Sequence, residues 1–407
     1  MYESNTDKKN YIMKILHTSD WHLGQSFMGK SREEEHQAFL AWLLEVIEEK
    51  KINVLIVAGD IFDTGTPPNY ALELYYNFLT KLSVSSCKNI IITAGNHDSI
   101  ATLKAPKQLL KALNIHVITS GDENENEVIE IFNKEKLEGI VCAVPYLRDY
   151  VVRQSVSSQT LNDKESSLTQ GIKEHYQSVY KEALKLLNEQ NIPIIATGHL
   201  TTVGSKTSES EREIYIGGTL DIDSGFLGKH FDYVALGHLH SNQKVGCEHV
   251  RYCGSPIPLS FSESSSQKKV NIVEFEYKAI TVTELDIPLH RALLVLRGDV
   301  TSILKDFESV EDKSTWIEVH LNDENPFHAN QVIRDKAEEL ELILLAVKID
   351  RVEKSLHTED FDVISLDELN PLDVFEQRLE QDALEDEEFV KELVVNFKQI
   401  VSEVQNS

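Results

Sequence analysis

The chain has 407 residues, which is long enough for two or three domains. Its hydrophobic content of 41% and charged content of 26% are ordinary for a globular protein, and no apolar run approaches the roughly 20 residues of a membrane helix. A formal net charge of -27 argues against a basic surface that binds nucleic acid through the phosphate backbone alone. Because the acidic excess is concentrated in residues 311–407, we expect any contact with a polyanion elsewhere.

Residues 1–12 form a polar N-terminal extension without the apolar core of a secretory signal, and Met13 is a candidate native start. The four cysteines contain no CxxC pair, which indicates reduced thiols of an intracellular protein. We therefore expect a cytoplasmic protein that makes no contact with a membrane.

Five short runs of β-branched and apolar residues each end in side chains that can bind a metal. In chain order they are residues 13–22 with Asp20 and His22, 52–60 with Asp60, 89–98 with Asn96, His97 and Asp98, 192–199 with His199, and 233–240 with His238 and His240. A single histidine at a strand end is more often structural. The ordered set of five predicts a metal site.

Helical patterns at residues 33–50 and 69–82 separate the first three runs. Alternating strands and helices predict a layered α/β fold, in which ligands collect beyond the carboxyl ends of the strands. Glycine allows the backbone to turn sharply at four of these ends, at positions 59, 95, 198 and 237. The five strand ends are therefore expected to converge.

The candidate ligands are too numerous for one tetrahedral ion and suit two; they are Asp20, His22, Asp60, Asn96, His199, His238 and His240. Mixed imidazole, carboxylate and amide donors are compatible with manganese, iron or zinc. Two ions about 3.5 to 4 Å apart form the clamp used for in-line displacement at phosphorus. The expected reaction is hydrolysis of a phosphoester.

Roles within this set follow from its chemistry. Asp60 is alone on its strand end and has two carboxylate oxygens, so we expect it to bridge both ions. His97 is interpreted as a non-ligating acid whose imidazolium is held by Asp98 and serves the leaving oxygen or the phosphorane.

The motifs DWH, GDIFD, GNHD, GHLTT and GHLH resemble those of the calcineurin-like metallophosphoesterases. Longer strings such as VAGDIFDTGTPP and RYCGSPIPLSF are similar to the bacterial branch of the DNA double-strand-break repair nucleases, and specific motifs cover about residues 13–275. The resemblance implies a four-layer sandwich fold for residues 13–280. It also implies one ion at Asp20, His22, Asp60 and His240, a second at Asp60, Asn96, His199 and His238, and a catalytic His97.

One position departs from the wider family. Archaeal and eukaryotic members typically have a histidine where this chain has Asp63, so the role of that histidine is not carried over. The resemblance further implies Mn2+ dependence, exonuclease action on double-stranded DNA ends, endonuclease action on hairpin and single-stranded DNA, and an SMC-like ATPase partner in repair, recombination and replication. The sequence has no GxxxxGK[ST] motif, so ATP-driven work needs another chain.

Beyond the nuclease region, residues 281–360 are expected to form a small α+β domain with the order β, α, β, α, β. The resemblance implies a DNA-capping domain there; the alternative is a stabilising addition. Residues 361–407 are expected to form two helices, the second with an apolar stripe that docks on the ATPase. The alternative is that this stripe packs on its own domain.

Three other features carry weaker expectations. Residues 151–171 suggest a surface excursion before a helix at 173–189. Lys30 and Arg32 are candidate phosphate contacts, although lone bases in a loop are more often simply solvated. An apolar group is compatible with either a homodimer face or an internal core; it contains Tyr70, Tyr75, Phe78, Leu109, Leu110 and Leu113.

Two other functions remain open from the residues. The same metal chemistry can act on a small phosphodiester or a phosphoprotein, although the additional C-terminal region argues for a larger substrate. A non-catalytic scaffold for an ATPase is a third possibility, but it predicts lost ligands, and every ligand position is filled.

Overall fold

The computed structural model describes residues 12–122, 126–152, 161–207, 211, 214, 222–323, 326–349 and 397. The helices expected in residues 361–407 lie outside these residues apart from Phe397, as does the extension up to residue 11. Within the described ranges, no helix has the length and apolar character needed to cross a membrane.

The first of two large sheets carries the strands that precede Asp20, Asp60 and Asn96. Its strand order is β14-β13-β1-β4-β5-β6, with β1, β4, β5 and β6 mutually parallel and β13 and β14 antiparallel. The bounds are β1 (Met13–Thr18), β4 (Val54–Ala58), β5 (Asn89–Thr93), β6 (Ile115–Ile118), β13 (Lys269–Glu276) and β14 (Ala279–Asp286). Strand β14 belongs to this sheet throughout, so the sheet continues past the expected boundary at residue 280.

The second sheet carries the strands that lead to the remaining ligand positions. Its order is β11-β12-β10-β9-β8-β7, with the four central strands parallel and the two edge strands antiparallel. The bounds are β7 (Val128–Asn133), β8 (Lys136–Cys142), β9 (Ile194–His199), β10 (Tyr233–Gly237), β11 (Gln243–Val245) and β12 (Cys247–Tyr252). Strands β9 and β10 are buried throughout, as expected for parallel strands covered on both faces.

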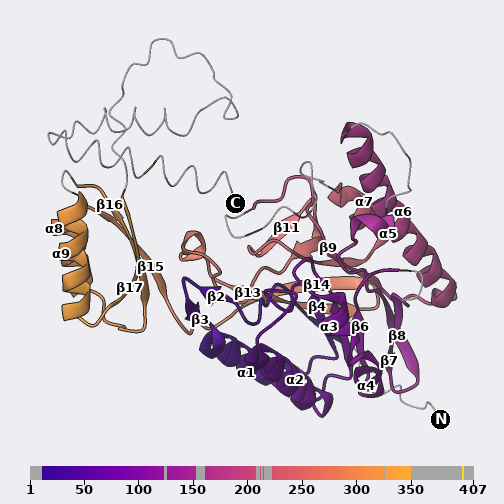
Figure 1. The fold of residues 1–407 in the computed structure, drawn as a ribbon. Coiled ribbons are helices and arrows are strands. Elements are labelled where there is room, and N and C mark those ends of the chain that lie inside the picture. The colour runs from indigo at the N-terminus through magenta and orange to yellow at the C-terminus, as the bar shows by residue number, and fades with distance from the viewer. Residues whose placement is uncertain are drawn as a thin grey trace. The chain divides into compact units, whose positions relative to one another are not determined.

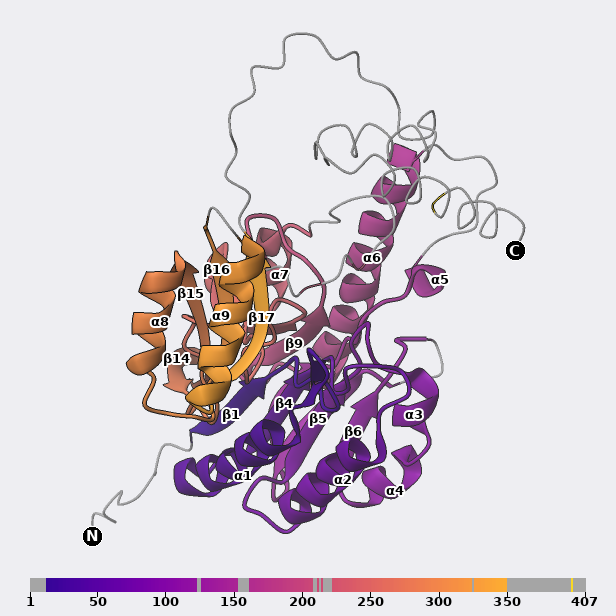
Figure 2. The same ribbon diagram turned by 60° about the vertical axis from the view of Figure 1, so that its left-hand side comes forward.

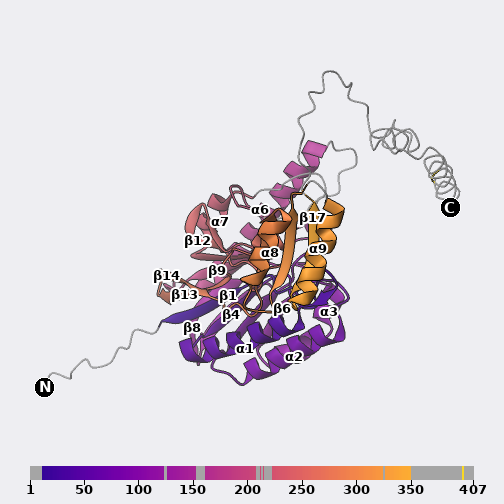
Figure 3. The same cartoon turned by 90° about the vertical axis from the view of Figure 1, so that its left-hand side faces the viewer.

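The two sheets pack face to face through an apolar layer that includes Ile15, Val54 and Ile91 from the first and Ile195 and Ala235 from the second. Helices α1 (Glu33–Lys50) and α2 (Asn69–Ser83) cover the outer face of the first sheet, as Figures 2 and 3 show. Helices α6 (Leu161–Leu187) and α7 (Ser224–His230) cover the outer face of the second. The expected four-layer sandwich is confirmed.

Local sequence predicts the first helices well and the sixth poorly. The bounds of α1 match the predicted range, because its apolar stripe is buried against the sheet. Helix α6 begins at Leu161, so the surface excursion expected up to residue 171 is wrong for its second part. Buried Leu168 and Ile172 extend the stripe of α6, and this burial outweighs the low helix propensity of the surrounding serines and threonines.

Residues 293–349 form a third, three-stranded parallel sheet in the order β15-β16-β17, whose connecting helices α8 and α9 lie on one face (Figure 1). The bounds are β15 (Leu293–Gly298), α8 (Val300–Glu308), β16 (Trp316–Leu321), α9 (Pro326–Glu339) and β17 (Ile343–Ile349). The predicted alternation of strands and helices is observed. The shorter elements are β2 (Ser26–Phe27), β3 (Lys30–Ser31), α3 (Ile100–Lys104), α4 (Lys107–Ala112), α5 (Asp149–Val152) and the 3-10 turn η1 (Phe261–Glu263).

Candidate metal centre

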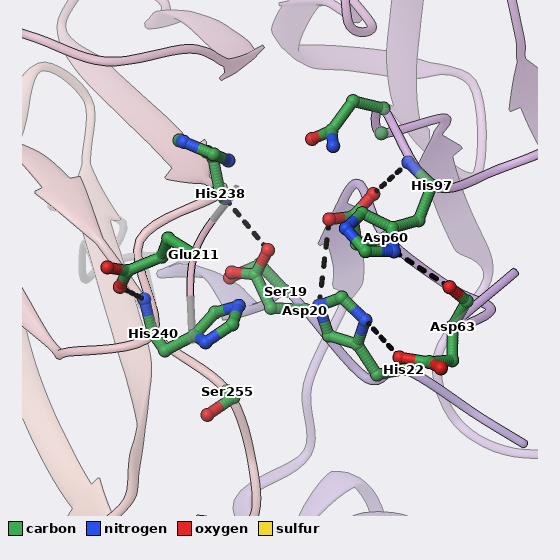
Figure 4. Close-up of polar contacts among 12 residues, drawn as sticks. Ser19, Asp20, His22, Asp60, Asp63, His97, Glu211, His238, His240 and Ser255 are labelled. Atoms are coloured by element: carbon green, nitrogen blue, oxygen red, sulfur yellow. Dashed lines mark hydrogen bonds and ion pairs between the residues drawn. The ribbon is translucent and has the colours of Figure 1, made fainter. Parts of the chain in front are cut away.

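Five strand ends meet at one place, as the sequence predicts. Parallel strands of one sheet end at the same edge, and the two sheets bring these edges together. The loops after β1, β4, β5 and β10 and the last residue of β9 supply the side chains, several of which Figure 4 shows. The residues gathered there are buried, except for half-buried Asn96 and His97; they are Asp20, His22, Asp60, Asn96, His97, His199, His238 and His240.

Strained backbone positions hold four of these residues. Asp20, His22, Asp60 and His238 all have positive φ angles, of 52°, 47°, 50° and 96°. Such conformations are costly for residues other than glycine, and they persist where the surrounding structure fixes them. Cross-links supply that fixation, because the His238 N–H donates to Asp20 Oδ1 at 2.8 Å and the His22 N–H donates to the Asp60 carbonyl at 3.0 Å.

The glycines near the site have two different functions. Gly59 has a φ of +88°, so it provides the turn that the sequence predicts. Gly95 does not have a positive φ. Instead, a Cβ at Gly95 would collide with the backbone nitrogen and carboxylate of Asp60. The glycine at 95 therefore permits close approach rather than a turn.

Asp20, His22 and His240 place one possible donor atom each within 4.8 Å of one another. His22 Nδ1 lies 3.2 Å from Oδ1 of Asp63, and an ionised carboxylate only accepts, so Nδ1 carries the proton. The other nitrogen, Nε2, is buried without a hydrogen-bond partner and lies 3.6 Å from Asp60 Oδ2. This orphaned acceptor faces a carboxylate, which is the arrangement that an intervening cation satisfies.

A second group contains Asp60 and His199 together with Asp20. His199 Nδ1 lies 3.1 Å from the Ala58 carbonyl, which can only accept, so it donates there. His199 Nε2 lies 2.9 Å from Asn96 Oδ1 and 3.3 Å from Asp60 Oδ2, so it also faces two oxygen acceptors. Burial lowers the pKa of His199, but the Asp60 carboxylate outweighs burial and raises this pKa to about 9. The convergence of donors on Nε2 marks a position suited to positive charge.

The remaining electrostatics favour metal binding. Burial raises the pKa of Asp20, whereas His199 and His22 overcome burial and hold the pKa of Asp60 below its usual range. Burial lowers the pKa of His238 to about 3, which keeps its imidazole neutral, the form that binds a metal. Two buried carboxylates surrounded by imidazoles need cations to balance their charge. The donor set fits two divalent ions.

The environment of His97 differs from the prediction. Its Nδ1 lies 2.7 Å from the backbone carbonyl of Asp63, and its N–H donates to Asp60 Oδ1 at 2.9 Å. The ring centroid lies 4.8 Å from that of His22, and a donor atom of His97 lies close to both His22 and Asp60. Proximity alone therefore does not distinguish a ligand from an acid at this position.

Asp98 has a structural role in place of the predicted one. Its carboxylate accepts the N–H groups of Gly95, Ile61 and Phe62 at 2.8 to 3.1 Å, which ties the loops after β4 and β5 together. The prediction that Asp98 holds the His97 ring is corrected, because the Asp63 carbonyl accepts from Nδ1 of that ring.

Sequence reasoning missed two carboxylates next to the ligands. Asp63 contacts His22 and His97, and Glu263 Oε1 lies 3.5 Å from Nδ1 of His240. Asp63 ends the GDIFD motif and Glu263 follows the RYCGSPIPLSF string, so proximity to recognisable motifs was the available signal.

The two candidate phosphate contacts separate in the structure. Lys30 is exposed in β3. Arg32 is fully buried, donates to Glu35 Oε1 at 2.8 Å and to the Pro258 carbonyl at 2.9 Å, and lies 5.2 Å from the ring centroid of Trp316. Arg32 is therefore not available to a phosphate, and that interpretation is corrected.

The apolar group considered as a dimer face is divided in the same way. Tyr75, Phe78 and Leu110 are buried in the core beside the first sheet, and Tyr70 is half-buried against it. Leu109 and Leu113 are exposed, with 68% and 43% of their surface accessible. Most of the group is internal core.

Comparison with known proteins places the chain in a family. Residues 13–242 match the calcineurin-like phosphoesterases, and residues 290–383 match the family described as type 5 capsule protein repressor C-terminal domain. The D subunit of nuclease SbcCD from Escherichia coli K12 is 40% identical over 92% of this chain and 94% of its own length. Proteins of the same name from Rhodobacter capsulatus and Bacillus subtilis are 33% and 30% identical, over 70% and 76% of this chain and 71% and 79% of their own lengths. The chain belongs to the calcineurin-like phosphoesterase family and, within it, groups with the nuclease subunits of SbcCD complexes.

Proposed function

We propose that this chain is a metal-dependent nuclease subunit that hydrolyses phosphodiester bonds in DNA. The observation that carries the proposal is the pair of buried donor groups that share the strand ends of two sheets, with Asp60 Oδ2 lying 3.6 Å from His22 and 3.3 Å from His199. The name of the relatives supports DNA as the substrate.

The proposed ligands divide into two sets with Asp60 in both. One set is Asp20, His22, Asp60 and His240, and the other is Asp60, Asn96, His199 and His238. Two divalent ions, when bound, lower the pKa of an attacking water and stabilise charge that develops on the phosphate. We propose Mn2+ because imidazole, amide and carboxylate donors suit it better than Mg2+.

In this proposal His97 transfers a proton and does not bind an ion. The Asp63 carbonyl fixes one proton on Nδ1, so Nε2 is the nitrogen that exchanges a proton with the leaving oxygen. Asp60 Oδ1 accepts from the His97 N–H and so keeps this residue beside the donor groups.

The wider proposal concerns substrates and assembly. We propose exonuclease action on double-stranded DNA ends and endonuclease action on hairpin and single-stranded DNA, in a complex with an SMC-like ATPase. A partner with its own basic surface resolves the conflict between a net charge of -27 and a polyanionic substrate. We propose that residues 281–360 cap the DNA, that residues 361–407 dock on the ATPase, and that the complex is a cytoplasmic homodimer of such subunits.

Cleavage of an end-labelled hairpin duplex tests the proposal. We expect wild-type protein to cut with Mn2+, to stop with EDTA, and to lose cutting in His97→Ala while still binding two ions. His290→Ala is the matched control, since His290 is an exposed histidine. His97→Ala with full cutting would refute its catalytic role, whereas wild-type protein that hydrolyses only a small phosphodiester would favour the alternative substrate class.

A further inference from the structure

A buried ion pair outside the two donor groups lies against His240. Glu263 and Lys268 are 3% and 6% exposed, and Oε2 of Glu263 lies 2.5 Å from Nζ of Lys268. Removing two charges from water is expensive, and a pair of apolar residues often stabilises a fold equally well. A buried pair at this position therefore calls for a reason other than stability.

The contacts of the pair supply that reason, because they hold His240 at two points. Lys268 Nζ donates to the backbone carbonyl of His240 at 2.9 Å, and Glu263 Oε1 lies 3.5 Å from Nδ1 of the His240 ring. The ring and the main chain of this one histidine are therefore fixed by two oppositely charged groups that are themselves bound together.

The pair is rigidly supported. Lys268 Nζ also donates to Ser255 Oγ at 2.9 Å, and Glu263 Oε2 accepts the Leu259 N–H at 3.2 Å. Glu263 ends the turn η1, which begins at Phe261, and the Phe261 ring packs 5.2 Å from the ring of Phe27. A side chain held by this many contacts has one available position.

We propose that Glu263, fixed by Lys268, is a positioning residue that orients His240 as a metal ligand. A carboxylate that accepts from one imidazole nitrogen fixes the tautomer, directs the other nitrogen to the metal and raises its basicity. Glu263 performs this for His240 from outside the group formed by Asp20, His22 and His240. The inference rests on the proposed metal centre and assigns a function to the segment that follows the RYCGSPIPLSF string.

The test measures metal affinity directly. Full-length protein stripped with EDTA is titrated with Mn2+, and the free ion is followed by electron paramagnetic resonance. We expect wild-type protein to bind two ions, and Glu263→Gln to weaken one of them about 10- to 100-fold while the other is unchanged. The Mn2+ concentration for half-maximal cutting rises by the same factor, and cutting at saturating Mn2+ recovers.

Glu284→Gln is the matched control. Glu284 forms the equivalent pair with Lys269, the residue next to Lys268, at 2.8 Å, but that pair is partly exposed. We expect Glu284→Gln to bind both ions with wild-type affinity. If Glu263→Gln also binds both ions with wild-type affinity, the proposal is wrong.

A second variant covers a failure to fold. Glu263→Gln leaves Lys268 as an uncompensated buried charge, so circular dichroism is recorded first. If the single variant is unfolded, the titration is made on the double variant Glu263→Gln/Lys268→Gln, which removes both charges; wild-type affinity at both sites there overturns the proposal. Wild-type protein that binds no ion overturns the metal centre and this inference together, whereas two ions without DNA cleavage refutes only the nuclease.

Discussion

The backbone carbonyl of Asp63 lies 2.7 Å from Nδ1 of His97, and the carboxylate of the same residue lies 3.2 Å from Nδ1 of His22. One residue thus supports two histidines through different parts of its structure. Both contacts leave the second ring nitrogen, Nε2, as the atom that acts at the site. Because only one contact uses the side chain, substitution of Asp63 separates the two histidines experimentally.

We predict that Asp63→Ala weakens metal binding but leaves the proton transfer by His97 in place. Losing a carboxylate that orients a ligand typically costs about 10- to 100-fold in metal affinity. Cutting is therefore expected to fall at low Mn2+ and to recover at saturating Mn2+. Thr64→Ala is the control, because Thr64 is exposed and its hydroxyl donates to the Thr66 carbonyl, away from both histidines. A loss of cutting that saturating Mn2+ does not restore would contradict the prediction.

The strands and ligands were predictable because local sequence determines them. A short apolar run buried on both faces is recognisable as a strand, and a polar side chain directly after it must lie at the carboxyl edge of the sheet. Asp60 and His199 could therefore be assigned to one site although the chain between them is long. The helix α6 was less predictable, since the burial of Leu168 and Ile172 depends on the second sheet.

The interactions around the ligands were not predictable from neighbouring residues. Asp98 follows His97 in sequence, yet its carboxylate accepts from three backbone N–H groups, one of them on Gly95 and two after β4. Arg32 has a charge in a polar loop, but its burial depends on Trp316 in a different sheet. Such partners come from distant segments, and a single sequence does not indicate which segments meet.

We predict that Gly95→Ala damages the site although it adds only a methyl group. The added Cβ would collide with the backbone nitrogen and carboxylate of Asp60, so the loop or the carboxylate must move. Overpacking of this kind typically costs about 1–3 kcal/mol, and displacement of a shared ligand should weaken both ions. Gly65→Ala is the control, because a Cβ there makes an ordinary contact with Ser99. Chemical denaturation with and without Mn2+ measures both effects, and an unchanged metal-induced stabilisation in Gly95→Ala would contradict the prediction.

We predict a pH-dependent contribution of Glu263 to the stability of metal-free protein. Burial raises the pKa of Glu263, but His240 and Lys268 outweigh burial and hold this pKa well below its usual range. A carboxyl whose folded pKa is depressed adds stability that is present above its unfolded pKa, about 4.3, and is lost as the pH falls through the folded pKa. At pH 7 we expect Glu263→Gln to cost about 3–5 kcal/mol, because Lys268 becomes an unpaired buried charge.

Urea denaturation in EDTA between pH 7 and pH 3 measures this contribution. The free energy of unfolding of wild-type protein should fall more steeply below about pH 4 than that of Glu263→Gln, so the two curves converge. Parallel curves across this range would show that Glu263 is not ionised in the folded protein, against the prediction.

We predict opposite effects for the two bases near β3. Arg32 lies between the rings of Phe27 and Trp316, at 5.3 and 5.2 Å, and its guanidinium donates to Glu35. Lysine keeps the charge but loses this planar geometry, so Arg32→Lys should lower the free energy of unfolding by about 1–3 kcal/mol and leave the affinity for DNA unchanged.

Lys30→Ala should do the reverse. Lys30 is exposed, so its removal should leave stability within about 0.5 kcal/mol of wild type. If Lys30 contacts a phosphate, the variant should bind duplex DNA more weakly and the slope of log affinity against log salt should fall by about 1. Binding is measured with Ca2+ in place of Mn2+ to suppress cutting. A salt slope that changes in Arg32→Lys and not in Lys30→Ala would show that the buried base, rather than the exposed one, meets the DNA.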